Sequence, residues 1–193
     1  WQAHWITPPE DEDPGYGLRP AQSMSVAFTV SAPVRRARLY STALGIYEAF
    51  VNGEVAGTGP LAPGSTSYDR TLYAQASDVT DALRRGDNQL EIVLSDGWYR
   101  GQVGAFRRPS QWGTTLAARA ELHIQGCDGS WQIVRSDDTW RSAPSTITRA
   151  DLMEGQRTDF TTPISGVRPV PVDQVDAPPV SYSPAPPLRV VDS

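Results

Sequence analysis

The chain has 193 residues, of which 39% are hydrophobic and 20% charged, and its formal net charge is −5. This composition is typical of a soluble globular domain, and the acidic balance argues against a nucleic-acid-binding role, which needs cations to neutralise phosphates. Apolar runs such as Ile92–Leu94 are far too short to cross a bilayer. The length predicts one domain with extensions rather than two domains.

The N-terminal segment has its own composition. Residues 1–22 contain the acidic, proline- and glycine-rich stretch PPEDEDPGYGLRP, which predicts a loosely ordered loop. The chain begins at Trp1 without a signal-peptide pattern, so we expect a piece of a longer protein, with cytoplasmic and secreted locations both open. The single cysteine, Cys127, excludes an internal disulfide.

Short alternating runs begin at Ser25 and predict strands. The runs 25–30 and 37–42 are followed by YEAFVNG at 47–53, which places Tyr47, Ala49 and Val51 on one face. The pair Asn52-Gly53 predicts a hairpin with VAGTG as the return strand, because both residues tolerate the positive φ of a type I′ turn.

The second half of the pattern adds one helix and two more strands. Residues 77–88 (SDVTDALRRGDN) predict a short capped helix, and QLEIVL at 89–94 predicts a half-buried strand. AARAELHI at 117–124 alternates in the same way, and Asp128-Gly129 turns it into WQIVR at 131–135.

These elements together predict an all-β sandwich or barrel with one short helix. We place the sandwich domain at residues 23–162. From residue 163 the chain is dense in proline, which predicts an extended linker.

The sequence contains no motif that is typical of a catalytic site. His4 and His123 match no metal-ligand spacing, and no nucleophile-elbow motif is present. Glycoside hydrolysis needs only two carboxylates, but spacing along the chain nominates no pair among the 22 acids. Loops such as SDGWYRG and GCDGS contain the hard oxygen ligands that calcium takes, although no EF-hand pattern occurs.

The stretch SDGWYRG at 95–101, together with Trp112, carries the main candidate binding residues. Aromatic faces can stack on sugar rings and guanidinium groups donate hydrogen bonds to hydroxyls, which makes Trp98, Tyr99, Arg100 and Trp112 candidates for a carbohydrate-binding surface. The competing interpretation is that these aromatics, Trp98 above all, close the end of the hydrophobic core.

Several stretches in order resemble one family. They are WQAHWI, ARLYSTALGIYEAFVNGEVAG, LAPGSTSYDRTLYAQASDVTDALRRGDNQLEIVLSDGWYRG and DDTWRSAPSTITRADLMEGQRTDF, followed by PPLRV. Together they resemble the N-terminal β-sandwich domain of bacterial alpha-L-rhamnosidases.

The resemblance implies a jelly-roll sandwich of the galactose-binding-domain type, placed before an (α/α)6 barrel that hydrolyses the substrate with inversion. The barrel would then be the partner of this domain in the same polypeptide, and this chain would hold no catalytic residue. Some related modules bind L-rhamnose through calcium held by an Asp-Asn pair, so Asp87 and Asn88, together with Asp96, are the calcium candidates. The expectation is nevertheless no metal and no cofactor. The resemblance also implies an inward-facing Trp140 and places Asp151, Glu154 and Gly155 in the last irregular loop.

Two functions follow. The favoured one is a noncatalytic accessory domain of an alpha-L-rhamnosidase, which supports the catalytic barrel and lines its cleft. The alternative is an autonomous carbohydrate-binding module for L-rhamnose-containing glycans. A free-standing glycosidase would require hydrolysis by the isolated chain, and we expect none.

Overall fold

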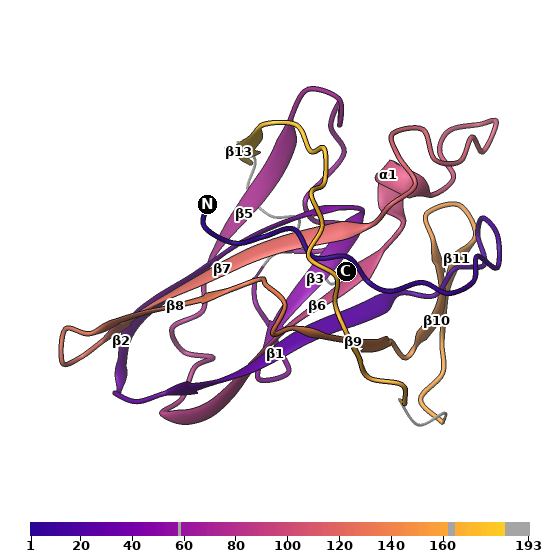
Figure 1. The fold of residues 1–193 in the computed structure, drawn as a ribbon. Coiled ribbons are helices and arrows are strands. Elements are labelled where there is room, and N and C mark those ends of the chain that lie inside the picture. The colour runs from indigo at the N-terminus through magenta and orange to yellow at the C-terminus, as the bar shows by residue number, and fades with distance from the viewer. Residues whose placement is uncertain (58, 162–164, 184–193) are drawn as a thin grey trace, which may run out of the picture.

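The computed structural model describes residues 1–57, 59–161 and 165–183. Within these ranges the regular secondary structure is almost entirely strand, and one helix of four residues is present (Figure 1). The elements in chain order are β1 (Gln22–Val30), β2 (Val34–Leu44), β3 (Ile46–Val51), β4 (Glu54–Val55), β5 (Leu72–Asp78), β6 (Gly86–Ser95), α1 (Gly97–Arg100), β7 (Ala117–Gly126), β8 (Trp131–Arg135), β9 (Arg141–Pro144), β10 (Ile147–Asp151), β11 (Gly155–Thr158), β12 (Arg168–Pro169) and β13 (Val180–Tyr182).

Two sheets form the sandwich. One has the order β12-β9-β1-β6-β3-β4 and the other the order β13-β5-β2-β7-β8, while β10 and β11 form a separate hairpin. Inward side chains from both sheets make the main core, in which Trp140 is fully buried and donates its indole N–H to the carbonyl of Arg135 at 2.8 Å. The predicted β-sandwich and the inward Trp140 are therefore confirmed.

The two predicted hairpins are present. Asn52 and Gly53 have φ of 53° and 82°, as the type I′ turn requires, and Val51 pairs with Glu54 across it. Strands β7 and β8 pair around the Asp128-Gly129 turn. Thr58, within the predicted return strand, lies outside the described residues.

The predicted helix at 77–88 is wrong. Ser77 and Asp78 instead end β5, where they pair with β2, and β6 already begins at Gly86. The side chain of Asn88 holds the intervening turn, since it accepts from the amide of Arg84 and donates to the carbonyls of Arg84 and Gly86. Tertiary pairing with β2 outweighs a local preference for one or two helical turns.

The five-stranded sheet is covered on its outer face as well. Leu44 and Ala117 face away from the main core and lie in a second cluster with Trp5, Tyr68 and Leu72, which we call the outer cluster. The partly buried members of the outer cluster are Trp98, Tyr99, Trp112, Val175, Ala177 and Val180. Segments near both ends of the chain therefore pack over one end of this sheet, forming a partial third layer.

The described part of the proline-rich segment lies along the sandwich. β12 pairs with β9, β13 pairs in parallel with β5, and Val170 is buried in the main core. Its role as a linker, and the domain limits at residues 22/23 and 162/163, stay predictions. PPLRV at 186–190 lies outside the described residues. Of the residues that are described, none belongs to a helix with the length and apolar character of a membrane span.

Candidate functional site

The candidate site is the end of the sandwich where β6 runs into α1. Gly97 makes this junction, with a φ of 54°. A Cβ at this position would lie 2.4 Å from Cγ2 of Ile46 and 2.8 Å from the backbone nitrogen of Ile46. Only glycine fits so close to β3, and the turn it allows directs Asp96 and Arg100 to the same side.

Asp96 is the centre of an ion network that local sequence patterns did not reveal. Its Oδ2 lies 3.0 Å from Nη1 of Arg19, and its Oδ1 accepts from Nε of Arg100 at 2.7 Å. The Asp96 side chain is 2% exposed, and those of Arg19 and Arg100 are 7% and 5% exposed. One buried carboxylate thus joins two guanidinium groups from distant parts of the chain.

The acidic N-terminal loop provides the remaining counterions. Glu10 pairs with Arg100 through both carboxylate oxygens, and Asp13 pairs with Arg19 at 2.7 and 2.6 Å. Arg168, in β12, binds Asp11 and the carbonyl of Pro9. The loop, which the sequence predicted to be loosely ordered, is therefore tied down by three arginines.

The pairing shifts the pKa of several of these groups. Hydrogen bonds from Arg19 and from the amide of Gly15 lower the pKa of the Asp13 carboxyl from 3.8 to about 2. The hydrogen bond to Asp13 raises the pKa of Arg19. Burial lowers the pKa of Arg100, but the attraction of Glu10 and Asp96 outweighs burial and the net shift is upward. These shifts of pKa favour the charged forms of Asp13, Arg19 and Arg100.

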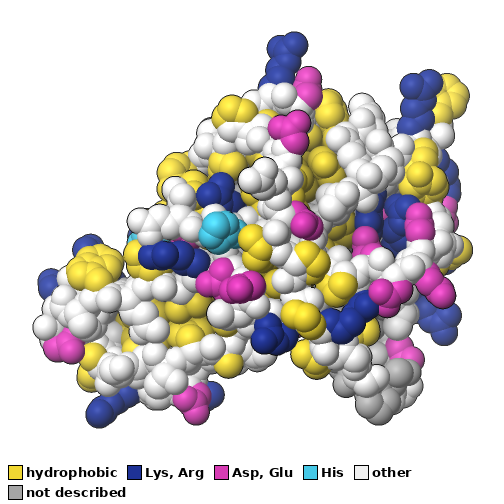
Figure 2. Space-filling view, in the orientation of Figure 1, with side chains coloured by type: hydrophobic (Ala, Val, Ile, Leu, Met, Phe, Trp, Pro, Cys, Tyr) yellow, Lys and Arg dark blue, Asp and Glu magenta, His cyan; other side chains and the backbone are white. Residues whose placement is uncertain are grey.

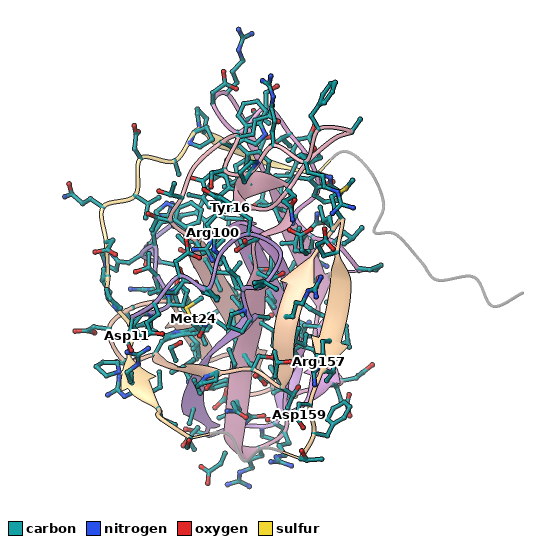
Figure 3. The ribbon with its side chains drawn as sticks, turned by 90° about the vertical axis from the view of Figure 1, so that its right-hand side faces the viewer. Asp11, Tyr16, Met24, Arg100, Arg157 and Asp159 are labelled. Atoms are coloured by element: carbon teal, nitrogen blue, oxygen red, sulfur yellow. The ribbon has the colours of Figure 1, made fainter. Side chains whose placement is uncertain are left out.

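A hollow of about 720 Å³ lies beside the network. Tyr16 and Arg100 both line it, and Figure 3 shows these two residues close together. The centroid of the Tyr16 ring lies 4.5 Å from the guanidinium carbon of Arg19. Residues 9–14 form much of its wall. The hollow is strongly charged, and most of that charge is internally paired.

The predicted sugar-binding residues do not form one exposed surface. Arg100 is 4% exposed and fully engaged by carboxylates, so its guanidinium is not free for a ligand. Trp98, Tyr99 and Trp112 are all half-buried against the outer cluster.

The rings pack closely on one another. The centroid of the Tyr68 ring lies 5.4 Å from that of Tyr99 and 5.9 Å from that of Trp112. Burial raises the pKa of both Tyr68 and Tyr99. The sugar-binding role of Trp98, Tyr99, Arg100 and Trp112 stays a prediction.

The calcium candidates do not fit a single ion. Asp96 already faces two cations, and the amide of Asn88 is used by Arg84, Gly86 and Asn52. Asp87 is exposed and accepts from the hydroxyl of Thr29. Within the described ranges, no group of three or more His, Cys, Asp or Glu side chains is placed to hold a metal. Calcium dependence, like the expected lack of a cofactor, stays a prediction.

The residues predicted in the last irregular loop belong to the β10–β11 hairpin instead: Asp151 ends β10, Glu154 lies in the turn and Gly155 begins β11. Asp151 accepts from the amides of Met153, Glu154 and Gln102, and Glu154 pairs with Arg107 and Arg149. The contacts of Asp151 with Gln102 and of Glu154 with Arg107 fasten the hairpin to the loop that follows α1, and Figure 1 places the hairpin and this loop at the same end of the molecule.

The fold and this site define a β-sandwich domain whose charged end is closed by its own N-terminal loop. Residues 32–192 match the family model described as the alpha-L-rhamnosidase N-terminal domain. The chain therefore belongs to this family.

Relatives and solved structures agree with this assignment. The chain is 44% identical over 126 residues to an alpha-L-rhamnosidase of Streptomyces avermitilis, covering 65% of this chain and 12% of the relative. The structure of Streptomyces avermitilis alpha-L-rhamnosidase complexed with L-rhamnose superimposes with a TM-score of 0.75 at 36% identity, over 82% of this chain and 16% of that one. The alpha-L-rhamnosidase of Dictyoglumus thermophilum shares the fold, with a TM-score of 0.85 at 24% identity, over 100% of this chain and 23% of that one. The chain thus corresponds to one domain of much longer polypeptides.

The ion network makes stability depend on acid in a defined way. Because the pKa of Asp13 is depressed on folding, its contribution is fully present above pH 3.8 and is lost as the pH falls through about 2. We expect Asp13→Asn to flatten the dependence of unfolding free energy on pH between about 4 and 2, as measured by urea unfolding at several pH values. Equal slopes for the wild type and the variant would contradict the Asp13–Arg19 pairing.

Proposed function

We propose that this chain is a noncatalytic accessory domain of an alpha-L-rhamnosidase, which supports the catalytic (α/α)6 barrel of the same polypeptide and lines part of its substrate cleft. The observation that carries the proposal is that the carboxylates at the charged end are paired with arginines of the same chain. A glycosidase needs one carboxylic acid of raised pKa and one free carboxylate across the bond to be cleaved. Here Glu10, Asp13 and Asp96 are all bound to arginines, and the shift of Asp13 is downward.

The size of the relatives supports an accessory role. This chain spans between 12% and 23% of the rhamnosidases compared above, so most of each relative lies outside the region that corresponds to it. An accessory domain needs a surface against which its neighbour packs. Exposed apolar side chains occur at the α1 end, where Phe106 is 88% and Leu18 53% exposed.

The alternative, an autonomous module for L-rhamnose-containing glycans, rests on a different observation. Trp98, Tyr99 and Trp112 keep part of their ring surface exposed although they pack on the outer cluster. Exposed aromatic surface is suited to stacking against sugar rings.

A direct test separates these functions. We expect the isolated chain to release no product from an aryl alpha-L-rhamnoside and to give no heat with millimolar L-rhamnose in calorimetric titration, either with calcium or with chelator. Hydrolysis that Glu10→Gln or Asp96→Asn abolishes would overturn the noncatalytic assignment. Saturable heat that Trp112→Ala abolishes would favour the autonomous module.

Support of the barrel predicts a difference between the isolated chain and the whole enzyme. Phe106→Ser should leave the unfolding free energy of the isolated chain within about 0.5 kcal/mol of wild type, because the ring is solvent-exposed. In the full-length polypeptide the same change should lower the temperature of thermal inactivation, because the ring would be covered there. Phe160→Ser, at a ring 84% exposed near the β10–β11 hairpin, is the matched control. Equal effects of the two changes in the full-length enzyme would argue against docking at Phe106.

A further inference from the structure

The outer face of the five-stranded sheet has a second half that the terminal segments leave uncovered. Side chains on this half come from four strands, and their positions follow from the register. Arg38 on β2 lies opposite both Asp78 on β5 and His123 on β7, and Gln125 on β7 lies opposite Trp131 on β8. Because side chains alternate along a strand, Arg36, Arg38 and Tyr40 share this face while Ala37 and Leu39 enter the core.

These side chains line a hollow of about 440 Å³, which we call the sheet groove. Its volume is within the range of small-molecule sites, about 300–1,000 Å³. The residues lining the sheet groove are Arg36, Ala37, Arg38, Tyr40, Asp78, His123 and Trp131. Figure 2 shows basic, acidic, histidine and hydrophobic side chains side by side on the face of the molecule that carries β7 and β8.

The aromatic side chains of the sheet groove present a usable stacking surface. Trp131, at the start of the edge strand β8, is 58% exposed. The guanidinium carbon of Arg36 lies 5.5 Å from its ring centroid, which holds the indole over the sheet. The rings of Tyr40 and His123 meet edge to face at 5.3 Å, and the Tyr182 ring lies 6.1 Å from that of Tyr40. An aromatic row thus crosses the sheet from β13 toward β8.

The charges of the sheet groove favour an anion. Two arginines face one aspartate, and the single pair between them is weak, with 4.0 Å from Nη2 of Arg38 to Oδ2 of Asp78. Asp78 is engaged mainly by Thr80, whose amide and hydroxyl both donate to its Oδ1. Among the described residues, the side chain of Arg36 makes no ion pair or hydrogen bond, and its guanidinium lies over the Trp131 ring. Its N–H donors are therefore free to bind a ligand, whereas Arg19 and Arg100 at the α1 end are paired with carboxylates.

We propose that the sheet groove binds an acidic saccharide, with a sugar ring stacked on Trp131 and a carboxylate held by Arg36 and Arg38. The planar guanidinium matches a carboxylate with two parallel hydrogen bonds, and an indole face matches the C–H face of a pyranose. The choice of a saccharide among anions rests on the proposed function in an enzyme of glycans. The sheet groove is separate from Trp98, Tyr99 and Trp112 and would give the domain a second, charge-selective contact with the glycan.

The test uses one probe pair on the isolated chain. Calorimetric titration with a linear trimer of D-galacturonate should give saturable binding that weakens at 1 M NaCl, whereas the methyl-esterified trimer, which has the same rings without charge, should bind at least roughly tenfold more weakly. Arg36→Gln and Trp131→Ala should each weaken binding of the acidic trimer by about tenfold or more.

Trp1→Ala is the matched control, because Trp1 is also an exposed ring beside an arginine, Arg119, but lies outside the sheet groove. Trp1→Ala should bind as the wild type does, and unchanged unfolding midpoints would show that all three variants fold. Absence of binding, equal binding of the esterified trimer, or full binding by Arg36→Gln would overturn the proposal. None of these outcomes bears on the hydrolysis or Phe106 tests, so the sheet groove and the proposed accessory function fail independently.

Discussion

The structure of the α1 end of the sandwich depends on one buried carboxylate, that of Asp96. Asp96 is joined to Arg19 and Arg100, and through them to Asp13 and Glu10 of the N-terminal loop. A buried guanidinium without a counterion is strongly unfavourable, and Asp96 is the fully buried carboxylate that both arginines share, while Asp13 and Glu10 each pair with one of them. The position of α1, the path of the N-terminal loop and the shape of the adjacent hollow all follow from this arrangement. The guanidinium of Arg100, in the GWYR segment, is thus bound by the carboxylates of Asp96 and Glu10.

The two halves of the outer sheet face differ in how far other segments cover them. At the α1 end, Trp5, the 175–180 segment and the rings of Trp98, Tyr99 and Trp112 form an apolar layer over the sheet. At the other end the sheet keeps Arg36, Arg38 and Trp131 exposed to solvent, with His123 half-buried beside them and bonded to Glu121. A β-sandwich needs only one buried face per sheet. The apolar layer on half of the outer face of the five-stranded sheet therefore adds stability beyond that of the main core. We interpret the covered half as the structural end and the open half as the end available to a ligand.

Local sequence rules predicted the parts of the fold that depend on neighbouring residues. Alternation identified the inward faces of β3, β6 and β7, and Asn52-Gly53 identified a hairpin because the turn itself requires positive φ. The same rules failed at residues 77–88, since the strand there is held by β2, 38 or more residues earlier in the chain. Pairs such as Arg100–Glu10, separated by 90 residues, and Arg168–Asp11, separated by 157, leave no local pattern. The sheet groove likewise required the register of four strands, because its residues come from β2, β5, β7 and β8.

The most direct test of this account is the unfolding free energy of Asp96→Asn compared with that of Asp87→Asn, the same chemical change at an exposed site. The account predicts a loss of about 3–5 kcal/mol for Asp96→Asn, because two buried guanidinium groups lose their shared counterion. It predicts a change within about 0.5 kcal/mol for Asp87→Asn. Equal, small losses for both variants would mean that the ion network does not organise this end of the domain.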